Sequence, residues 1–257
     1  MNKTTANIRP ILVIDSGIGG FSTLVKAIKQ TNANYIYFAD NKFSPYGKKE
    51  SVFLKNRLTE IINTAIKKYN ISMAILACNT ATTSAIHFLR KTFPNLTIIG
   101  TEPALKVALD KGFKNPALIA TPRTIENIKN NVDKKIKLLK SKTLASLIEQ
   151  YYLSPSPLNS FNLTKELFKI KTKLKTSDCL VLGCTHYCFL KEKLSKITKL
   201  PLINGNSGVS NQISRNYAFK TTNNCSIKII LSDKNSSSMK KYKKILKQIL
   251  ANQIKLW

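Results

Sequence analysis

The sequence predicts an α/β protein built from two pseudo-symmetric α/β domains with mainly parallel sheets and a site in the cleft between them. Short β-rich runs alternate with helical patterns along all 257 residues, as in parallel sheets covered by helices. Two segments also resemble each other. Residues 73–80 and 179–186 are both apolar runs that end on a cysteine followed by small polar residues. This similarity suggests a duplicated pair of domains.

The predicted elements follow one another in short, regular steps. Strands are expected at 11–14, 35–39, 73–77, 97–99, 117–120, 179–182, 202–203 and 227–231. Helical patterns are expected at 21–30, 49–69, 80–90, 103–111, 163–173 and 239–254. Residues 133–157 fit neither period, and Ser-Pro-Ser-Pro at 154–157 is predicted to be a loop.

Turn-rich sequence near residue 100 and at 204–208 sets the predicted domain boundaries. We expect a discontinuous first domain, residues 1–99 and 206–257, and a second domain at 100–205. Each of the two cysteine segments then belongs to a different domain.

Composition indicates a globular protein with an unusual charge. Apolar residues make up 43% of the chain, and 42 Lys and Arg against 13 Asp and Glu give a net charge of +29. The lysines are spread along the chain, so we attribute the charge to compositional drift and expect at most nonspecific binding of nucleic acid.

Five cysteines without regular spacing predict reduced thiols. The polar start and the lack of a long apolar run predict a cytoplasmic protein, a monomer or homodimer, with no membrane partner.

The first chemical motif is Asp15-Ser-Gly-Ile-Gly-Gly20, where a strand meets a helix. Glycines let backbone N–H groups approach an anion at a helix N-terminus. Ser22 replaces the last glycine of a dinucleotide fingerprint, so a small carboxylate is the expected guest. Alternatively, Asp15 only caps the helix. In a second segment, the loop at 44–47 either presents the Tyr46 hydroxyl and backbone N–H groups to a ligand or is an ordinary surface loop.

Cys78 and Cys184 end the two similar strands. Ligands bind at the carboxyl ends of parallel strands, and two opposed thiols suit removal of a proton from one face of a carbon and its return to the other. Each thiol opens a predicted helix, which is expected to lower its pKa, and His186 is placed to tune Cys184. Cys179, Cys188 and Cys225 are read as small apolar residues. No metal site is predicted, because paired C-x-x-C ligands are absent.

Four motifs together resemble those of bacterial glutamate racemases, in the cofactor-independent aspartate/glutamate racemase superfamily. They are Asp15-Ser-Gly-Ile-Gly-Gly20, Pro45-Tyr-Gly47, Ala77-Cys-Asn-Thr80 and Leu182-Gly-Cys-Thr-His-Tyr187. The resemblance implies two α/β domains with the active site between them. It also implies cofactor-free interconversion of L- and D-glutamate, which supplies D-glutamate for peptidoglycan.

The resemblance also implies roles for individual residues. Cys78 and Cys184 would be the two acid/base residues, assisted by Asp15 and His186 respectively. The substrate would be held by Ser16, Tyr46, Gly47, Asn79, Thr80, Thr121 and Thr185.

The chain departs from the family pattern at three places. Ala39-Asp40 and Ala120-Thr121 carry alanine where the family has glycine. Ser154-Pro-Ser-Pro157 stands where the family has a Cys-Pro segment, and no acid is found at the expected place after it. We therefore expect His186 to be the main helper of Cys184. A racemase of aspartate or another amino acid, and a degenerate basic nucleic-acid-binding relative, are the alternatives.

Overall fold

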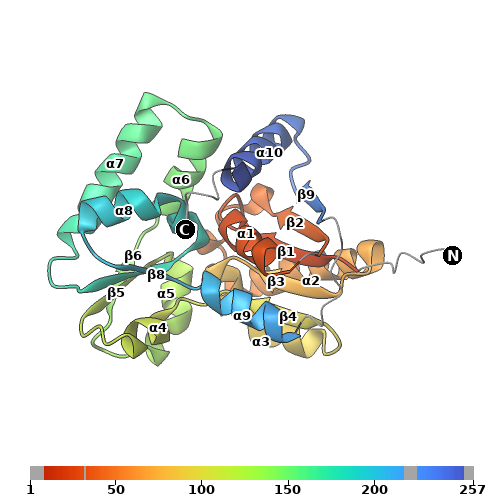
Figure 1. The fold of residues 1–257 in the computed structure, drawn as a ribbon, viewed down its shortest axis with the longest axis horizontal. Helices are drawn as coiled ribbons and strands as arrows, with labels where there is room; N and C mark the ends of the chain where they lie inside the picture. Colours follow the sequence, from red (N-terminus) through yellow and green to blue (C-terminus); the bar gives the residue numbers. More distant parts are fainter. Residues whose placement is uncertain (1–8, 32, 217–224, 252–257) are drawn as a thin grey trace.

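The computed structural model describes residues 9–31, 33–216 and 225–251. It contains two parallel sheets (Figure 1). The first has the order β4-β3-β1-β2-β9, formed by Thr97–Gly100, Met73–Leu76, Ile11–Asp15, Tyr35–Ala39 and Ile227–Leu231. The second has the order β6-β5-β7-β8, formed by Lys137–Lys140, Pro116–Ala120, Cys179–Gly183 and Leu202–Asn204. Every pair of neighbouring strands in the two sheets is parallel, so the predicted α/β fold class is confirmed.

Helices cover both faces of each sheet, as the alternation of strands and helices requires. The α-helices are α1 Phe21–Gln30, α2 Ser51–Tyr69, α3 Asn79–Thr92, α4 Leu105–Asp110, α5 Pro122–Ile128, α6 Leu144–Leu153, α7 Pro157–Thr172, α8 Lys191–Thr198, α9 Asn206–Asn216 and α10 Ser236–Ala251. Short 3₁₀ helices are η1 Asn41–Phe43, η2 Tyr46–Lys48, η3 Lys129–Asn131 and η4 Thr185–Leu190. None of the helices in these described ranges is long and apolar enough to cross a membrane.

The core follows the two-residue period of the strands. Along β1, Ile11 and Val13 pack on the face that α1, α9 and α10 cover, whereas Leu12 and Ile14 pack on the face covered by α2 and α3. The second sheet is buried in the same way between two clusters. All eight predicted strands are present, and the edge strands β4, β8 and β9 among them are only partly buried.

The structure contains a strand and a helix between residues 133 and 157, where the sequence pattern fitted neither a helix nor a strand. β6 is an edge strand whose Lys137 and Lys140 are exposed, so it lacks an apolar alternation. α6 follows it. The predicted loop at 154–157 runs into α7, where the Ser156 hydroxyl accepts the N–H of Asn159 (3.1 Å) and Pro157 takes the first turn. The predicted end of the last helix, at 254, lies outside the described residues.

Chain segments from both ends of the sequence build the first sheet. β9 pairs with β2, and α10 stands beside α6 (Figure 1). The last described part of the chain thus returns to the first sheet after the second sheet is complete. The exact residues of the domain boundaries stay a prediction.

Candidate active site

Two buried thiols lie just beyond the carboxyl ends of two central strands. Cys78 follows β3 in the first sheet and is 5% exposed, and Cys184 follows β7 in the second and is 6% exposed. Strand register alone brings each thiol to the sheet edge where ligands bind in open α/β sheets. Asp15 ends β1, the strand beside β3, and accepts the hydroxyl of Thr185, the residue after Cys184, at 3.0 Å. The two strand ends that carry the thiols therefore meet.

The pKa of Cys78 differs from the sequence-based expectation. Burial, followed by the charges of Asp15 and Cys184, raises it well above the ordinary value of a thiol. The backbone N–H groups of Thr80 and Ala81 at the start of α3 lower it only in part. The prediction that the helix N-terminus would give a low pKa was therefore wrong for Cys78, because desolvation outweighs the helix.

Asp15 joins the two halves of the site. Its Oδ1 accepts the N–H of Gly17, and its Oδ2 accepts the hydroxyl of Thr185 from the second sheet, both at 3.0 Å. Burial raises its pKa to about 6, although the charge of His186 opposes this. Helix α1 has Gly20 at its N-cap and no side-chain cap, so the alternative that Asp15 caps the helix was wrong.

An acid does stand beside His186, and it is Glu149 of α6. Its Oε2 is hydrogen-bonded to His186 Nε2, while His186 Nδ1 faces Cys184 Sγ at 3.9 Å. Burial by itself lowers the pKa of His186, but the charge of Glu149 and hydrogen bonds to Cys184 and Glu149 raise it well above its ordinary value. The expectation that no acid supports His186 was wrong, because Glu149 precedes the Ser-Pro-Ser-Pro segment in the sequence and meets His186 only in the folded chain.

The glycine-rich turn after β1 contacts the carboxylate of Glu149, and its binding of a small carboxylate ligand stays a prediction. The Ile18 N–H donates to both oxygens of Glu149, at 3.3 and 3.2 Å. A Cβ on Gly17 would lie 2.5 Å from Glu149 Oε2, and one on Gly19 would lie 2.6 Å from His186 Nδ1. These glycines therefore allow the turn after β1 to contact the second domain directly.

The predicted substrate residues divide into two groups. The hydroxyls of Thr80, Thr121 and Thr124 form a triangle with sides of 2.9, 2.9 and 3.0 Å that joins α3 to the start of α5. A Cβ on Gly47 would lie 2.5 Å from Thr121 Cβ, so the loop after β2 also reaches this point. Thr124 is an addition to the predicted set. Its only sequence signal is its place three residues after the helix-capping Thr121.

The remaining predicted groups are engaged with the protein. The Tyr46 hydroxyl donates to Asp40 (2.7 Å), and Tyr46 is fully buried. Its contact with a substrate stays a prediction. Arg57 donates to both oxygens of Asp40, from Nε to Oδ2 (2.9 Å) and from Nη2 to Oδ1 (2.7 Å). Asn79 donates its side-chain N–H to the Thr101 carbonyl (3.0 Å), which leaves its side-chain oxygen for other partners. Ser16 is buried beside Asp15.

The other three cysteines also have raised pKa values. Burial raises the pKa of Cys188 to about 12 and that of Cys179 to about 11, and burial also raises the pKa of Cys225. Within the described ranges no group of three or more His, Cys, Asp and Glu side chains is arranged to hold a metal ion.

Two buried thiols that follow the central strands of two parallel sheets define the class of protein: an α/β protein with a pair of cysteines at its candidate site. No family model matches the chain. A glutamate racemase of Clostridium botulinum is 36% identical over 262 residues, covering 93% of this chain and 97% of the relative. One of Buchnera aphidicola is 37% identical over 253 residues, or 93% of each chain. The chain belongs to the glutamate racemase family.

Solved structures agree with this assignment. The crystal structure of Escherichia coli glutamate racemase in complex with L-glutamate and the activator UDP-MurNAc-Ala is 25% identical, with a TM-score of 0.77 over 94% of this chain and 95% of that one. Glutamate racemase from Campylobacter jejuni, also 25% identical, has a TM-score of 0.75 over 93% of this chain and 98% of that one.

Proposed function

We propose that this protein interconverts L- and D-glutamate by moving the α-proton between the substrate and two thiols, Cys78 and Cys184. The observation that carries the proposal is the pair of buried thiols at the carboxyl ends of strands in different sheets, which the hydrogen bond between Asp15 and Thr185 joins. Family membership at 36% identity over nearly the whole chain supports glutamate as the substrate.

The two thiols have different environments in the free protein. The raised pKa of Cys78 keeps it protonated at neutral pH, which suits a proton donor. Cys184 Sγ faces Nδ1 of His186 at 3.9 Å, and the raised pKa of His186 favours the imidazolium. We assign the removal of the proton to this pair. For one enantiomer, the Cys184 thiolate removes the α-proton and the Cys78 thiol protonates the opposite face of the carbon.

Protons balance over this step without any other group. Cys184 ends as a thiol and Cys78 as a thiolate, which is the state needed to run the reaction in reverse. We assign to the buried carboxyl of Asp15, with a pKa of about 6, a part in returning the proton that converts the Cys78 thiolate back to a thiol. The Glu149–His186 pair serves Cys184 in the same way. No cofactor is needed for this transfer.

Substrate binding is assigned to donors around the thiols. Backbone N–H groups and hydroxyls at the start of α3 and α5 and after β7 stabilise the negative charge that develops on the carboxylate side of the substrate. These donors include Thr80, Thr121 and Thr185, with Asn79, Ser16 and Gly47 at the edges of the same space. Tyr46 completes the proposed substrate-binding set, and the hydrogen bond from its hydroxyl to Asp40 fixes the loop.

The cellular role follows from the reaction. We infer that the protein supplies D-glutamate for peptidoglycan, the role implied by its resemblance to bacterial glutamate racemases. All five cysteines are free, which suits a reducing cytoplasm. Every proposed site residue comes from one chain, so the proposal applies equally to a monomer and to a homodimer.

Proton exchange in heavy water tests the proposal directly. Purified protein incubated with L-glutamate in D₂O, with no cofactor added, should incorporate deuterium at the α-carbon and form D-glutamate. L-Aspartate serves as the control substrate and should exchange far more slowly. If glutamate acquires no deuterium, the proposed activity is wrong. If aspartate exchanges faster, the reaction class stands and the substrate assignment fails.

A further inference from the structure

Helix α10 brings a buried tyrosine to the acid that holds His186. Tyr242 is fully buried, and its hydroxyl donates to Glu149 Oε1 at 2.8 Å. The edge of its ring meets Phe21 of α1, with centroids 5.9 Å apart. The tyrosine ring is therefore fixed by packing, and its hydroxyl points at the carboxylate.

Glu149 is held by donors from three separate segments. Oε2 contacts His186 of η4, Oε1 accepts from Tyr242 of α10, and the Ile18 N–H of the turn after β1 reaches both oxygens. A carboxylate with donors on both oxygens has little freedom to rotate. These three donors fix the direction of the hydrogen bond between Glu149 and His186. They thereby also fix the distance from His186 to Cys184.

The hydroxyl of Tyr242 stays a donor under all working conditions. Burial, together with the charge and hydrogen bond of Glu149, raises its pKa well above that of a free tyrosine. A protonated hydroxyl against an ionised carboxylate is a charge-assisted hydrogen bond, which is stronger than a neutral one.

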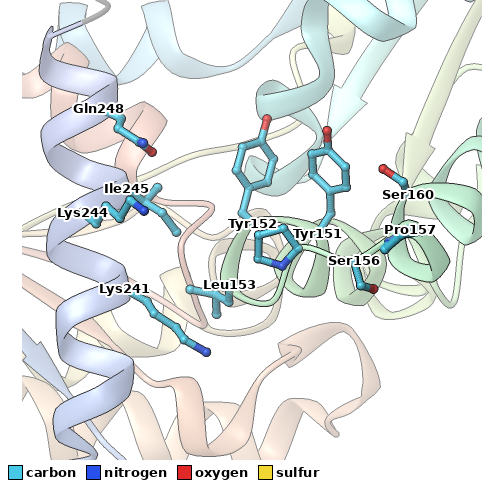
Figure 2. Close-up of a pocket in the computed structure, with 11 residues that line it drawn as sticks. Tyr151, Tyr152, Leu153, Ser156, Pro157, Ser160, Lys241, Lys244, Ile245 and Gln248 are labelled. Atoms are coloured by element: carbon cyan, nitrogen blue, oxygen red, sulfur yellow. The ribbon is translucent and has the colours of Figure 1, made fainter.

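The remaining surface of α10 faces an open groove, not the protein interior. Figure 2 shows Lys241, Lys244 and Gln248 of α10 across the groove from Tyr151 and Tyr152 of α6. The lysine side chains are exposed. Helix α10 thus has one solvent-exposed side and one buried side, and the buried side carries Tyr242, Ile245 and Leu246.

We propose that Tyr242 is a positioning residue of the active site, acting on His186 through Glu149. This inference rests on the proposed function. It makes α10 part of the catalytic apparatus, although no residue of α10 carries a motif of the family resemblance. Tyr242 is not among the residues proposed to bind the substrate. Its loss should therefore lower the rate of the chemical step and leave substrate binding unchanged.

Removing only the hydroxyl tests the proposal. Tyr242→Phe keeps the ring packed on Phe21, so the variant should fold. We expect kcat to fall about tenfold, as for loss of one hydrogen bond to a charged group, while KM changes less than about twofold. Enantiomers have equal free energies, so kcat/KM must fall equally in both directions. Rates are expressed per folded protein, as measured by circular dichroism.

Two single variants serve as matched controls. Lys244→Gln alters the same helix on its groove side and should leave kcat unchanged. Tyr35→Phe removes another buried tyrosine hydroxyl, one bonded to Thr31 far from the site, and should lower the melting temperature without lowering kcat.

A double-mutant cycle decides whether Tyr242 acts through Glu149. In a Glu149→Gln background, the same Tyr242→Phe change should lower kcat by less than about twofold, because the charge it supports is already gone. An unchanged kcat in the single variant, or the same tenfold loss in both backgrounds, overturns the proposal. Absence of α-proton exchange in the wild-type protein would instead refute the proposed function itself.

Discussion

At the scale of single residues, burial sets the charge states on which the site depends. Asp15 and His186 are both removed from water, yet their pKa values are pushed by different neighbours. Desolvation dominates at Asp15, whereas an adjacent carboxylate overrides desolvation at His186. Asp15 is therefore a carboxyl group that protonates readily, and His186 is a cation.

The two thiols should be indispensable. Cys78→Ala and Cys184→Ala each remove one of the two acid/base groups, and we expect kcat to fall at least about 10³-fold in either variant. Racemisation followed by circular dichroism of the amino acid checks this. Cys179→Ala, which removes a buried thiol from β7 itself, should leave kcat within about twofold. Near-normal turnover in either site variant would refute the two-thiol assignment.

Because of the buried Asp15 carboxyl, the free energy of unfolding should decrease as pH rises. Its pKa is about 6 in the folded protein, against 3.8 without burial. The folded state therefore holds a proton that the unfolded state has lost between pH 3.8 and 6, and stability declines through this window. Asp15→Asn removes the titration. The variant should gain about 2 kcal/mol in unfolding free energy relative to wild type between about pH 4 and pH 7.

Urea unfolding at several pH values measures the Asp15 effect. Asp133→Asn is the control, because Asp133 is exposed and a hydrogen bond from the Lys135 N–H lowers its pKa, so this variant should gain no stability as pH rises. A constant difference between Asp15→Asn and wild type across the range would mean that the carboxyl is not desolvated.

At the scale of elements, two short segments meet where the sheets face each other. The turn after β1 lies against η4, which carries Thr185 and His186. Gly17 and Gly19 make this contact possible, because a side chain at either position would occupy space already filled by the second domain. The sequence predicted a helix opening directly at Cys184; the structure has the 3₁₀ turn η4 before α8.

A methyl group at Gly19 should disturb the site. Its Cβ would lie 2.5 Å from Thr185 Oγ1 and 2.6 Å from His186 Nδ1. We expect Gly19→Ala to cost about 1 to 3 kcal/mol of stability and to lower kcat at least about tenfold, measured by urea unfolding and racemisation assays.

Gly208 provides the matched control for Gly19. It lies in α9, and a Cβ there meets no atom within 4 Å. Gly208→Ala should stabilise the helix by about 0.5 to 1 kcal/mol and leave kcat unchanged. If Gly19→Ala behaved like Gly208→Ala, the close contact between turn and η4 would not exist in solution.

At the scale of the whole molecule, the net charge of +29 is the dominant property. Thirteen acidic residues cannot neutralise 42 basic ones, and several acids are already paired, as in Asp40–Arg57 and Glu126–Lys129. Excess like charge repels itself across the folded surface. Binding of nucleic acid through this charge stays a prediction, expected to be nonspecific and to weaken steeply with salt.

Salt should therefore stabilise the protein. Raising NaCl from about 0.02 to about 0.3 M shortens the screening length from about 20 Å to about 6 Å, and we expect the melting temperature to rise by about 2 to 5 °C. An uncharged solute at equal osmolality is the control and should give a smaller rise. A melting temperature that falls with NaCl would show that specific ion pairs outweigh the general repulsion.

The amino-acid sequence by itself determined every described strand except β6, the parallel α/β class and the positions of both thiols. Each depends on local periodicity or on the residue that ends a buried strand, and such signals survive in a single sequence. Only the tertiary structure revealed Glu149, Thr124 and Tyr242 as parts of the site, and only it directed the Tyr46 hydroxyl to Asp40. Glu149 meets Ile18 across 131 residues and Tyr242 across 93. Contacts at such separations leave no local pattern, because they are fixed by how the packed elements meet.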